Sequence, residues 1–450
     1  MEIDPRQLFG TDGIRGMANA DLTPEFVLKT GKAISRFFGS NKKHAKILIG
    51  KDTRPSCDFI EAGLSSGIMS EGNDVLSAGI LSTPGIAILS RLIDTDGAIV
   101  ISASHNPLED NGIKIFKRGG IKLTDAEEKE LEDIILNNEQ ADDAKKTGLD
   151  IGRQKAVPDA LDRYIEFITK DFKFDLNGLK IAVDCANGAT SVAVPRVLAM
   201  FGADVISFNT DIRSGLINKD CGSTHPEILQ KLVKESKADI GFSYDGDGDR
   251  VIGCDRFTRI LDGDVFLAFS AILMKENNIL KNNGIVTTIM ANYGLEKAML
   301  EKNINIFKTK VGDRYVLEKM IEEDLIIGGE QSGHIIFRNF SNIGDGLLST
   351  LVFLNYLSES KINPDVVYEI IEHYPQVLRN IKVKNKNLIM ESTELREKIK
   401  DAENSLKGEG KIVVRSSGTE PLVRVMVEAK TMDIVEKIQE EICNFILTMK

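Results

Sequence analysis

The feature that most constrains the fold is an alternation of helix and strand patterns that restarts along the chain. The first section alternates predicted helices with short apolar runs, at residues Pro24–Phe38, Lys46–Gly50, Ser56–Glu71, Asp74–Gly79 and Gly97–Ser102. Thr23 is the predicted N-cap of the first helix. Because apolar runs of four to eight residues between helices are typical of wound sheets, this section predicts an α/β sheet covered by helices.

The same pattern begins again twice. A charged helix predicted at Thr124–Asn138 is followed by a polar stretch, Glu139–Lys155, which we interpret as a linker. Two strands of a second α/β section follow it, at Leu179–Cys185 and Asp239–Tyr244. A third section starts near Asp262 with an apolar helix, continues with a strand at Gly284–Met290, and ends at a break around Lys361–Pro364.

The last section differs from the first three. Three strands and then a helix that begins after Thr431, its predicted N-cap, are expected there, the strands at Gln376–Val383, Lys411–Arg415 and Leu422–Glu428. The sequence therefore predicts three similar α/β domains with mixed sheets, at residues 1–155, 156–257 and 258–368. A smaller α+β domain is expected at residues 369–450.

Charge and cysteine content exclude several classes of function. The 450 residues include 57 basic and 68 acidic side chains, a net charge of −11, which argues against a nucleic-acid partner. The chain has no apolar run that could span a bilayer and no signal peptide at Met1–Asp4, so no membrane partner is expected. The five cysteines lie far apart without a C-x-x-C pair and indicate reduced thiols in a cytoplasmic protein.

The densest chemical signal is the loop Asp245-Gly246-Asp247-Gly248-Asp249-Arg250, which follows a predicted strand. Its glycines allow the backbone to bend so that three carboxylates face one point, and three hard oxygen ligands suit Mg²⁺. An EF-hand does not fit, because Arg250 occupies its sixth position and Arg256 its twelfth. The alternatives are a metal site and a solvated acidic turn, and we expect the metal site.

A second loop, Ile101–Pro107, also leaves a strand, where α/β sheets place ligands. Ser104 beside His105 could be a nucleophile next to a general base. Adjacent residues rarely adopt triad geometry, so a hydrolase triad is not expected. Taken alone, the segment is more simply interpreted as an Asx-type turn stopped by proline. The string Gly63–Gly67 fits a nucleophile elbow but lies within a helical pattern, so we reject it.

Two further loops carry polar groups suited to a phosphorylated sugar. Glu330, Ser332 and His334 alternate along Gly328–His334, so in an extended loop they share one face and could bind sugar hydroxyls. Arg415–Pro421, with Arg424 close behind, combines arginines, hydroxyls and a glycine in the manner of a phosphate cradle. A plain glycine-rich turn is the alternative for each. No G-x-G-x-x-G follows a predicted strand, so a dinucleotide cofactor has no support.

These four loops occur in chain order, one per predicted domain. Together with Phe9–Gly16 they resemble the α-D-phosphohexomutases over essentially the whole chain. The glucosamine-specific branch of that family is most similar, on segments 9–16, 311–315, 329–334 and 424–428. The resemblance implies three α/β domains and a C-terminal domain around a central cleft. It also implies interconversion of glucosamine 6-phosphate and glucosamine 1-phosphate, on the route to UDP-N-acetylglucosamine. The alternatives are a mannose- or glucose-phosphate mutase and a non-catalytic sugar-phosphate-binding protein.

The resemblance also implies roles for individual residues. Ser104 would be the phosphoserine, and one Mg²⁺ per chain would be held by its phosphate with Asp245, Asp247 and Asp249. Acid/base work would fall to His105 and Lys114, and positive charge near Ser104 would come from Arg15 and Arg250. Sugar hydroxyls would be bound by Glu330, Ser332 and His334. The phosphate that does not react would be held by Arg415, Ser417, Gly418, Thr419 and Arg424. A sugar bisphosphate such as glucosamine 1,6-bisphosphate would prime the enzyme, whose partner is a sugar phosphate, and a homodimer is in keeping with the family.

Overall fold

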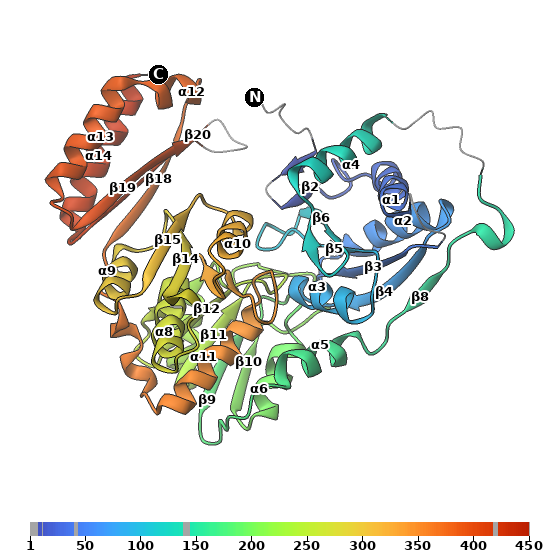
Figure 1. Ribbon diagram of the computed structural model, residues 1–450, viewed down its shortest axis with the longest axis horizontal. Helices are drawn as coiled ribbons and strands as arrows, with labels where there is room; N and C mark the ends of the chain where they lie inside the picture. The colour runs from blue at the N-terminus through green and yellow to red at the C-terminus, as the bar shows by residue number, and fades with distance from the viewer. Residues whose placement is uncertain (1–7, 11, 40–43, 138–144, 417–421, 450) are drawn as a thin grey trace. The chain divides into compact units, whose positions relative to one another are not determined.

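The computed structural model describes residues 8–10, 12–39, 44–137, 145–416 and 422–449 (Figure 1). The chain divides into two compact units, which are described separately below. Unit 1 comprises residues 1–266 and 332–368, and unit 2 comprises residues 267–331 and 369–450. Among the described helices, none combines the length and the apolar character that crossing a membrane requires.

Within its described residues, unit 1 opens with one mixed sheet of eight strands. The strands are β1 (Phe9–Gly10), β2 (Gly13–Met17), β3 (Lys46–Lys51), β4 (Asp74–Ile80), β5 (Gly97–Ile101), β6 (Asp110–Lys117), β7 (Ile121–Lys122) and β8 (Gln154–Ala156). Their order is β1-β2-β6-β5-β3-β4-β8, with β7 paired to β6. The pairs β3–β4, β3–β5 and β4–β8 are parallel, whereas β6 runs antiparallel to β5 and β2.

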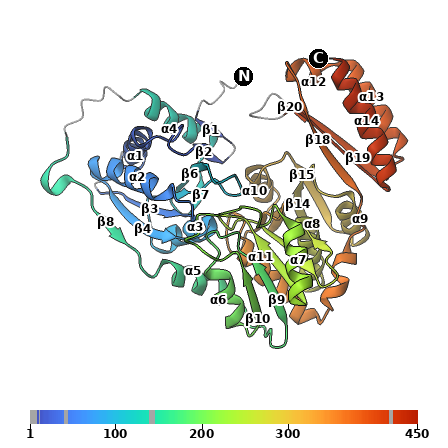
Figure 2. The ribbon, with the colours of Figure 1, turned by 180° about the vertical axis from the view of Figure 1, so that it is seen from behind.

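Helices cover both faces of this sheet. They are α1 (Pro24–Gly39), α2 (Cys57–Ser70), α3 (Thr83–Leu92) and α4 (Asp125–Asn137), with a short 3₁₀ turn, η1, at Gly148–Asp150. Because strand side chains alternate between faces, Ile47 and Ile49 enter the same apolar core as the inward residues of α1, α2 and α4. Helix α3 packs on β3 and β5, on the other side of these strands (Figures 1 and 2).

The polar stretch predicted as a linker is partly structured, which corrects the prediction. Residues 138–144 lie outside the described residues, but Gln154–Ala156 forms β8 and pairs in parallel with Val75–Ser77 of β4. All three side chains of β8 are exposed. An edge strand of this kind is held by its backbone hydrogen bonds, so it carries no apolar alternation that a sequence pattern could reveal.

A second sheet follows in unit 1. Its strands are β9 (Lys180–Asp184), β10 (Asp204–Phe208), β11 (Ile240–Tyr244), β12 (Val251–Asp255) and β13 (Ile260–Leu261), in the order β10-β9-β11-β12-β13. Strand β9 is parallel to β10 and β11, and β12 is antiparallel to β11, so this sheet is also mixed. The remaining elements of unit 1 are α5 (Ala160–Thr169), α6 (Ala193–Met200), α7 (Pro226–Ser236), β17 (Ile335–Phe337), α11 (Gly346–Ser360) and η3 (Pro364–Val366).

Unit 2 begins within α8 (Gly263–Glu276) and contains two sheets. In the first, β15 (Asn305–Thr309), β14 (Gly284–Thr288) and β16 (Ile327–Gly329) are neighbours in that order, and both pairs are parallel. This part also holds η2 (Lys281–Asn283), α9 (Tyr293–Glu301) and α10 (Asp313–Glu322). The turn η4 (Tyr368–Ile370) leads to the second sheet.

The second sheet of unit 2 is antiparallel, in the order β18-β20-β19. Its strands are β18 (Gln376–Lys382), β19 (Gly410–Ser416) and β20 (Leu422–Ala429). Helices α12 (Lys386–Glu391), α13 (Thr393–Ser405) and α14 (Met432–Thr448) complete this part, and α13 and α14 lie side by side against the sheet (Figures 1 and 2). Thr431 holds the predicted N-cap position of α14, but its side chain makes no capping hydrogen bond.

The predicted fold class is confirmed: three α/β sections, the first two with sheets that contain both parallel and antiparallel pairs, precede a smaller α+β section. The rejected nucleophile-elbow string, Gly63–Gly67, lies inside α2, as its periodicity predicted. The four domain boundaries remain predictions, because the compact units group the chain more coarsely.

Candidate active site

The acidic loop brings its three carboxylates together. Asp245, Asp247 and Asp249 follow β11, and each offers an oxygen atom within 4.8 Å of the other two. All three are buried. Gly248 has a φ of 74°, a left-handed conformation that favours glycine, and it lets the chain turn between the second and third carboxylate. The convergence predicted from the sequence is therefore present in the fold.

Ser104 lies beside this cluster. Its Oγ donates a hydrogen bond to Asp245 Oδ2 at 2.6 Å and is also 3.1 Å from His105 Nδ1. The contact joins the Ser-His pair that the sequence offered as a possible nucleophile and general base. Ser104 adopts a φ of 54°, a left-handed conformation that is uncommon outside glycine. The loop thus presents one hydroxyl to both a carboxylate and an imidazole.

Lys114 is buried among acidic groups. Its Nζ lies 2.7 Å from Asp12 Oδ2, 2.7 Å from Asp247 Oδ2 and 3.8 Å from Asp249 Oδ2. Burial on its own would lower the pKa of Lys114, but these three carboxylates raise it well above its usual range. Lys114 is therefore a fixed ammonium at neutral pH.

Two of the clustered aspartates have opposite pKa shifts. Burial, reinforced by the charges of Asp249 and Asp247, raises the pKa of Asp245 well above its ordinary value. Burial has the same tendency at Asp247, but the charge and hydrogen bond of Lys114 outweigh it and hold the pKa of Asp247 well below its ordinary value. A cation near Asp245 would relieve the repulsion among the carboxylates.

The donor set fits a hard divalent cation. Among the described residues, neither Asp247 Oδ1 nor Asp249 Oδ1 accepts a hydrogen bond, although both atoms are buried. Buried carboxylate oxygens are normally satisfied by donors or by metal. Three carboxylates and the Ser104 hydroxyl supply only oxygen ligands, which is the chemistry that Mg²⁺ prefers.

Two arginines approach the Ser104 loop. Arg15 donates to Asn106 Oδ1 at 3.2 Å and pairs with Asp12 at 3.3 Å. Arg250 lies 3.8 Å from Asp249 Oδ1 through its Nε, and its backbone N–H donates to Asp245. Burial, together with the charges of Arg250 and Arg15, lowers the pKa of His105 to about 4, so this imidazole is neutral at pH 7.

The predicted sugar-binding residues are placed in different surroundings. His334 is buried, forms a β-bridge with Arg250 and has its Nε2 4.0 Å from Asp249 Oδ2, so unit 1 brings it to the acidic cluster. Ser332, also in unit 1, is exposed. Glu330 belongs to unit 2, where its Oε1 accepts the Gly312 N–H at 3.0 Å.

Unit 2 places two of the predicted phosphate ligands directly opposite each other. Arg415 on β19 and Arg424 on β20 are cross-strand partners, and both are half-buried. Burial and the charge of Arg424 lower the pKa of Arg415, whereas Glu330 raises it. Like charges at facing positions are unfavourable unless an anion offsets them. Ser417, Gly418 and Thr419, the other predicted ligands, lie outside the described residues.

Some residues at the cluster were not singled out from the sequence. Asp12 pairs with both Lys114 and Lys122, the latter at 2.6 Å. Asp12 lies in the Phe9–Gly16 motif, and that position was the signal from which the sequence could have indicated a role for it. Thr83, at the start of α3, donates its hydroxyl and its backbone N–H to Asp247. The sequence carried no signal for Thr83, because 164 residues separate the two.

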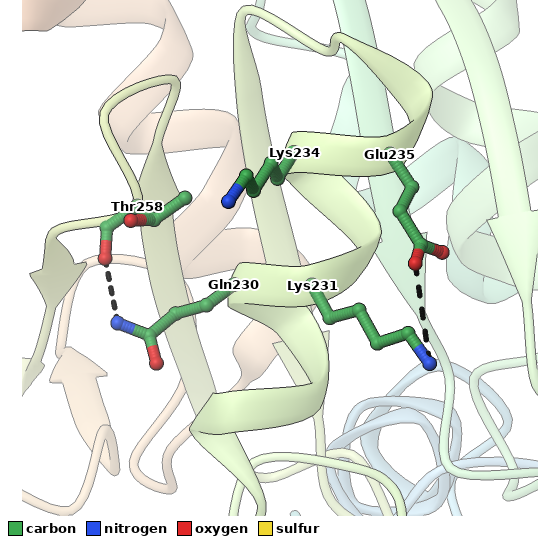
Figure 3. Close-up of a pocket in the computed structure, with 5 residues that line it drawn as sticks. All are labelled: Gln230, Lys231, Lys234, Glu235 and Thr258. Carbon is green, nitrogen blue, oxygen red and sulfur yellow. Dashed lines mark hydrogen bonds and ion pairs between the residues drawn. The ribbon is translucent and has the colours of Figure 1, made fainter.

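A surface hollow elsewhere in unit 1 lacks the buried charged side chains that surround Ser104. It is lined by four residues of α7, Gln230, Lys231, Lys234 and Glu235, and by Thr258 (Figure 3). Gln230 donates to the Thr258 carbonyl at 2.6 Å, and Lys231 pairs with Glu235 at 4.0 Å. None of these side chains is buried, so we assign no site to the hollow.

Comparison with known families identifies all four sections of the chain. Models of the phosphoglucomutase/phosphomannomutase α/β/α domains I, II and III match residues 6–142, 162–257 and 262–375, and the model of the C-terminal domain matches residues 378–445. A phosphoglucosamine mutase of Desulforamulus reducens is 45% identical over 442 residues, covering 97% of this chain and 99% of that one. One of Acetivibrio thermocellus is 46% identical over 443 residues, covering 98% of each chain.

Solved structures support the fold. A phosphoglucomutase/phosphomannomutase family protein of Burkholderia thailandensis has a TM-score of 0.80 at 24% identity, covering 98% of this chain and 96% of that one. A putative phosphomannomutase of Thermus thermophilus has a TM-score of 0.78 at 18% identity, covering 98% and 99%.

Proposed function

The chain belongs to the phosphoglucomutase/phosphomannomutase family, and from this premise we propose that it interconverts glucosamine 6-phosphate and glucosamine 1-phosphate. Relatives about 45% identical over nearly the full chain carry the name phosphoglucosamine mutase, which favours the amino sugar as substrate. The observation that carries the chemistry is the Ser104 hydroxyl, held 2.6 Å from a carboxylate of a buried acidic cluster.

In the proposed reaction Ser104 carries a phosphoryl group. A free hydroxyl of the sugar monophosphate attacks that phosphorus, an O–P bond to the sugar forms, and the Ser104 O–P bond breaks. The sugar is then a 1,6-bisphosphate. After it reorients, Ser104 Oγ takes the other phosphoryl group, and the isomeric monophosphate leaves. Atoms balance over the cycle, and a bisphosphate is needed only to phosphorylate Ser104 at the start.

The surrounding side chains have roles suited to this transfer. We assign Mg²⁺ to Asp245, Asp247 and Asp249 with the Ser104 phosphate; it would neutralise charge on the transferring group. The neutral His105 can accept the proton that the attacking hydroxyl releases. Lys114 keeps a fixed positive charge next to the cluster and would stabilise the negative charge of the transferring group, but its raised pKa does not favour the acid/base role predicted for it. The proton that His105 accepts would return to the sugar oxygen that leaves in the second transfer.

Binding of the rest of the substrate is assigned by the family resemblance. Arg415 and Arg424 would hold the phosphate that does not react, because their facing charges call for an anion. Ser417, Gly418 and Thr419 would supply further donors to it, and sugar hydroxyls would meet Glu330, Ser332 and His334. Cytoplasmic location and a homodimer remain predictions.

A hexose-phosphate mutase for glucose or mannose is the second candidate, because the matching family models carry those names. The two are separated by measuring kcat/KM for glucosamine, glucose and mannose 6-phosphates with Mg²⁺ and catalytic glucose 1,6-bisphosphate. The glucosamine substrate should be preferred, and chelation of Mg²⁺ should abolish turnover. A clear preference for glucose or mannose phosphate would overturn the substrate assignment. Substrate binding without any turnover would instead indicate a binding protein.

A further inference from the structure

Arg54 contacts the backbone of the Ser104 loop, and the proposed chemistry gives it no role. Arg54 follows β3, and its side chain is fully buried. Its Nε donates to Asp52 Oδ2 at 3.1 Å. Its two terminal nitrogens donate to four backbone carbonyls, those of Ser104 (3.0 Å), Asn106 (2.8 Å) and Pro107 (2.5 Å) in the loop and that of Asp110 (3.1 Å) at the start of β6.

This arrangement uses all five N–H donors of the guanidinium group. Three of the five hydrogen bonds go to the backbone of the Ser104 loop and a fourth goes to Asp110, where β6 begins, so the group holds the path of the chain from Ser104 to β6. A lysine at this position could supply at most three donors from a single point. The five hydrogen bonds therefore require an arginine at this position. If the side chain only had to balance the charge of Asp52, a lysine would be sufficient.

Both backbone polar groups of Ser104 are held by this network. The Ser104 carbonyl accepts from Arg54, as above, and also from Asn218 Nδ2 at 2.7 Å. The Ser104 N–H donates to Ser102 Oγ at 2.9 Å, and that hydroxyl donates to Asp52 Oδ2 at 2.6 Å. The buried Asp52–Arg54 pair thus fixes both backbone groups of Ser104: Arg54 binds the carbonyl directly, and Asp52 holds the N–H through the Ser102 hydroxyl.

These hydrogen bonds to its N–H and carbonyl explain how Ser104 keeps an unfavourable backbone conformation. A φ of 54° costs a non-glycine residue free energy, and it persists only where surrounding contacts enforce it. That same φ brings Ser104 Oγ to Asp245 Oδ2 and His105 Nδ1. Relaxation of the loop would therefore move the hydroxyl away from the groups it must meet.

We propose that Arg54 is a positioning residue that, with Asp52 and Asn218, holds Ser104 in the left-handed conformation required for phosphoryl transfer. The inference rests on the proposed role of Ser104. Arg54 is expected to act through the loop backbone and Asp52, because all five of its donors are engaged with these groups. Its loss should therefore lower kcat and leave KM for the sugar phosphate unchanged.

The test uses full-length wild type, Arg54→Lys and Asn218→Ala. Asn209→Ala is a matched control, because Asn209 and Asn218 both have a positive φ, but Asn209 donates its amide to Asp184 and not to a carbonyl of the Ser104 loop. Glucose 1,6-bisphosphate with Mg²⁺ serves as the phosphoryl donor. The rate of Ser104 phosphorylation is followed by intact mass, and kcat and KM are measured on the best substrate found. Thermal midpoints are recorded for each variant.

Arg54→Lys should reduce the phosphorylation rate and kcat by about 10- to 100-fold, the scale seen when an outer supporting group is lost. Asn218→Ala should reduce both by several-fold, and Asn209→Ala should leave both within about 2-fold of wild type. If Arg54→Lys fails to fold, Asn218→Ala decides the question. Normal phosphorylation and kcat in Asn218→Ala, or an equal loss in Asn209→Ala, would overturn the proposal. A wild type that is never phosphorylated on Ser104 would instead refute the proposed function itself.

Discussion

Glu428 on β20 is a fully buried carboxyl group with few compensating contacts. Its Oε1 accepts the Tyr293 N–H at the start of α9, and its Oε2 accepts Gln376 Nε2 at 3.2 Å. Lys411 Nζ lies 3.8 Å from Oε2. Burial raises the pKa of Glu428 to about 7, because Lys411 and the two hydrogen bonds only partly offset the loss of water.

The shift predicts a pH-dependent stability whose sign follows from proton binding. Between about pH 4.5 and pH 7 the unfolded chain has an ionised Glu428 while the folded chain keeps it protonated. The stabilisation is therefore complete below pH 4.5 and is lost as the pH rises through 7. A rise from 4.5 to about 7 is about 2.5 pKa units, and at 1.36 kcal/mol per unit this is about 3 kcal/mol.

Glu428→Gln isolates this contribution, because glutamine cannot ionise and its contact costs are the same at every pH. The stability of wild type minus that of the variant should fall by about 3 kcal/mol between pH 4.5 and pH 8. Native-state hydrogen exchange on peptides from β20 and α9, corrected for intrinsic rates, would register this as a change in protection of about 100-fold.

Glu409→Gln provides the control. Glu409 pairs with Lys430 at 3.0 Å, and both side chains are about half exposed, at 51% and 55%. Exposed pairs contribute little, so this variant should show no comparable pH-dependent difference. A stability difference between wild type and Glu428→Gln that does not change with pH would contradict a pKa of about 7 for Glu428, and so would the same pH dependence in Glu409→Gln.

Three further predictions concern the site and its support. Ser104→Ala should lower kcat by at least about 100-fold, and near-normal turnover would contradict the phosphoserine role. Arg415→Ala should raise KM for the sugar phosphate by about 10- to 100-fold through loss of a charge-assisted hydrogen bond. Arg379→Ala, an exposed change on the same sheet, should leave KM unaltered. Tyr164→Phe removes a hydroxyl that donates at 3.0 Å to buried Asp345, whose pKa burial raises to about 6. It should cost about 1.5–3 kcal/mol in urea unfolding at pH 8 and less at pH 5, and equal costs would contradict the assignment.

Much of the fold could be predicted because its signals are local. Helix α1 begins at Pro24 after Thr23, whose hydroxyl accepts the Phe26 N–H, as its capping role predicted. Strand β8 was missed because an exposed edge strand is specified by its partner's backbone and not by its own side chains. Long-range pairing of this kind leaves no periodicity in the sequence.

The candidate site shows the same difference between local signals, which the sequence carries, and long-range contacts, which it does not. The sequence by itself predicted which loops carry chemistry, because ligand types and spacing are local: three alternating aspartates, a Ser-His pair, and a turn that begins at Arg415 with Arg424 close behind. Only the tertiary structure decided that Lys114 meets Asp12 and Asp247, and that Arg54 lies beneath Ser104. Those contacts join residues 50 to 133 positions apart, and they depend on strand order and loop conformation. The left-handed φ of Ser104 is the clearest case, because it is imposed by groups distant in sequence and brings the hydroxyl to its partners.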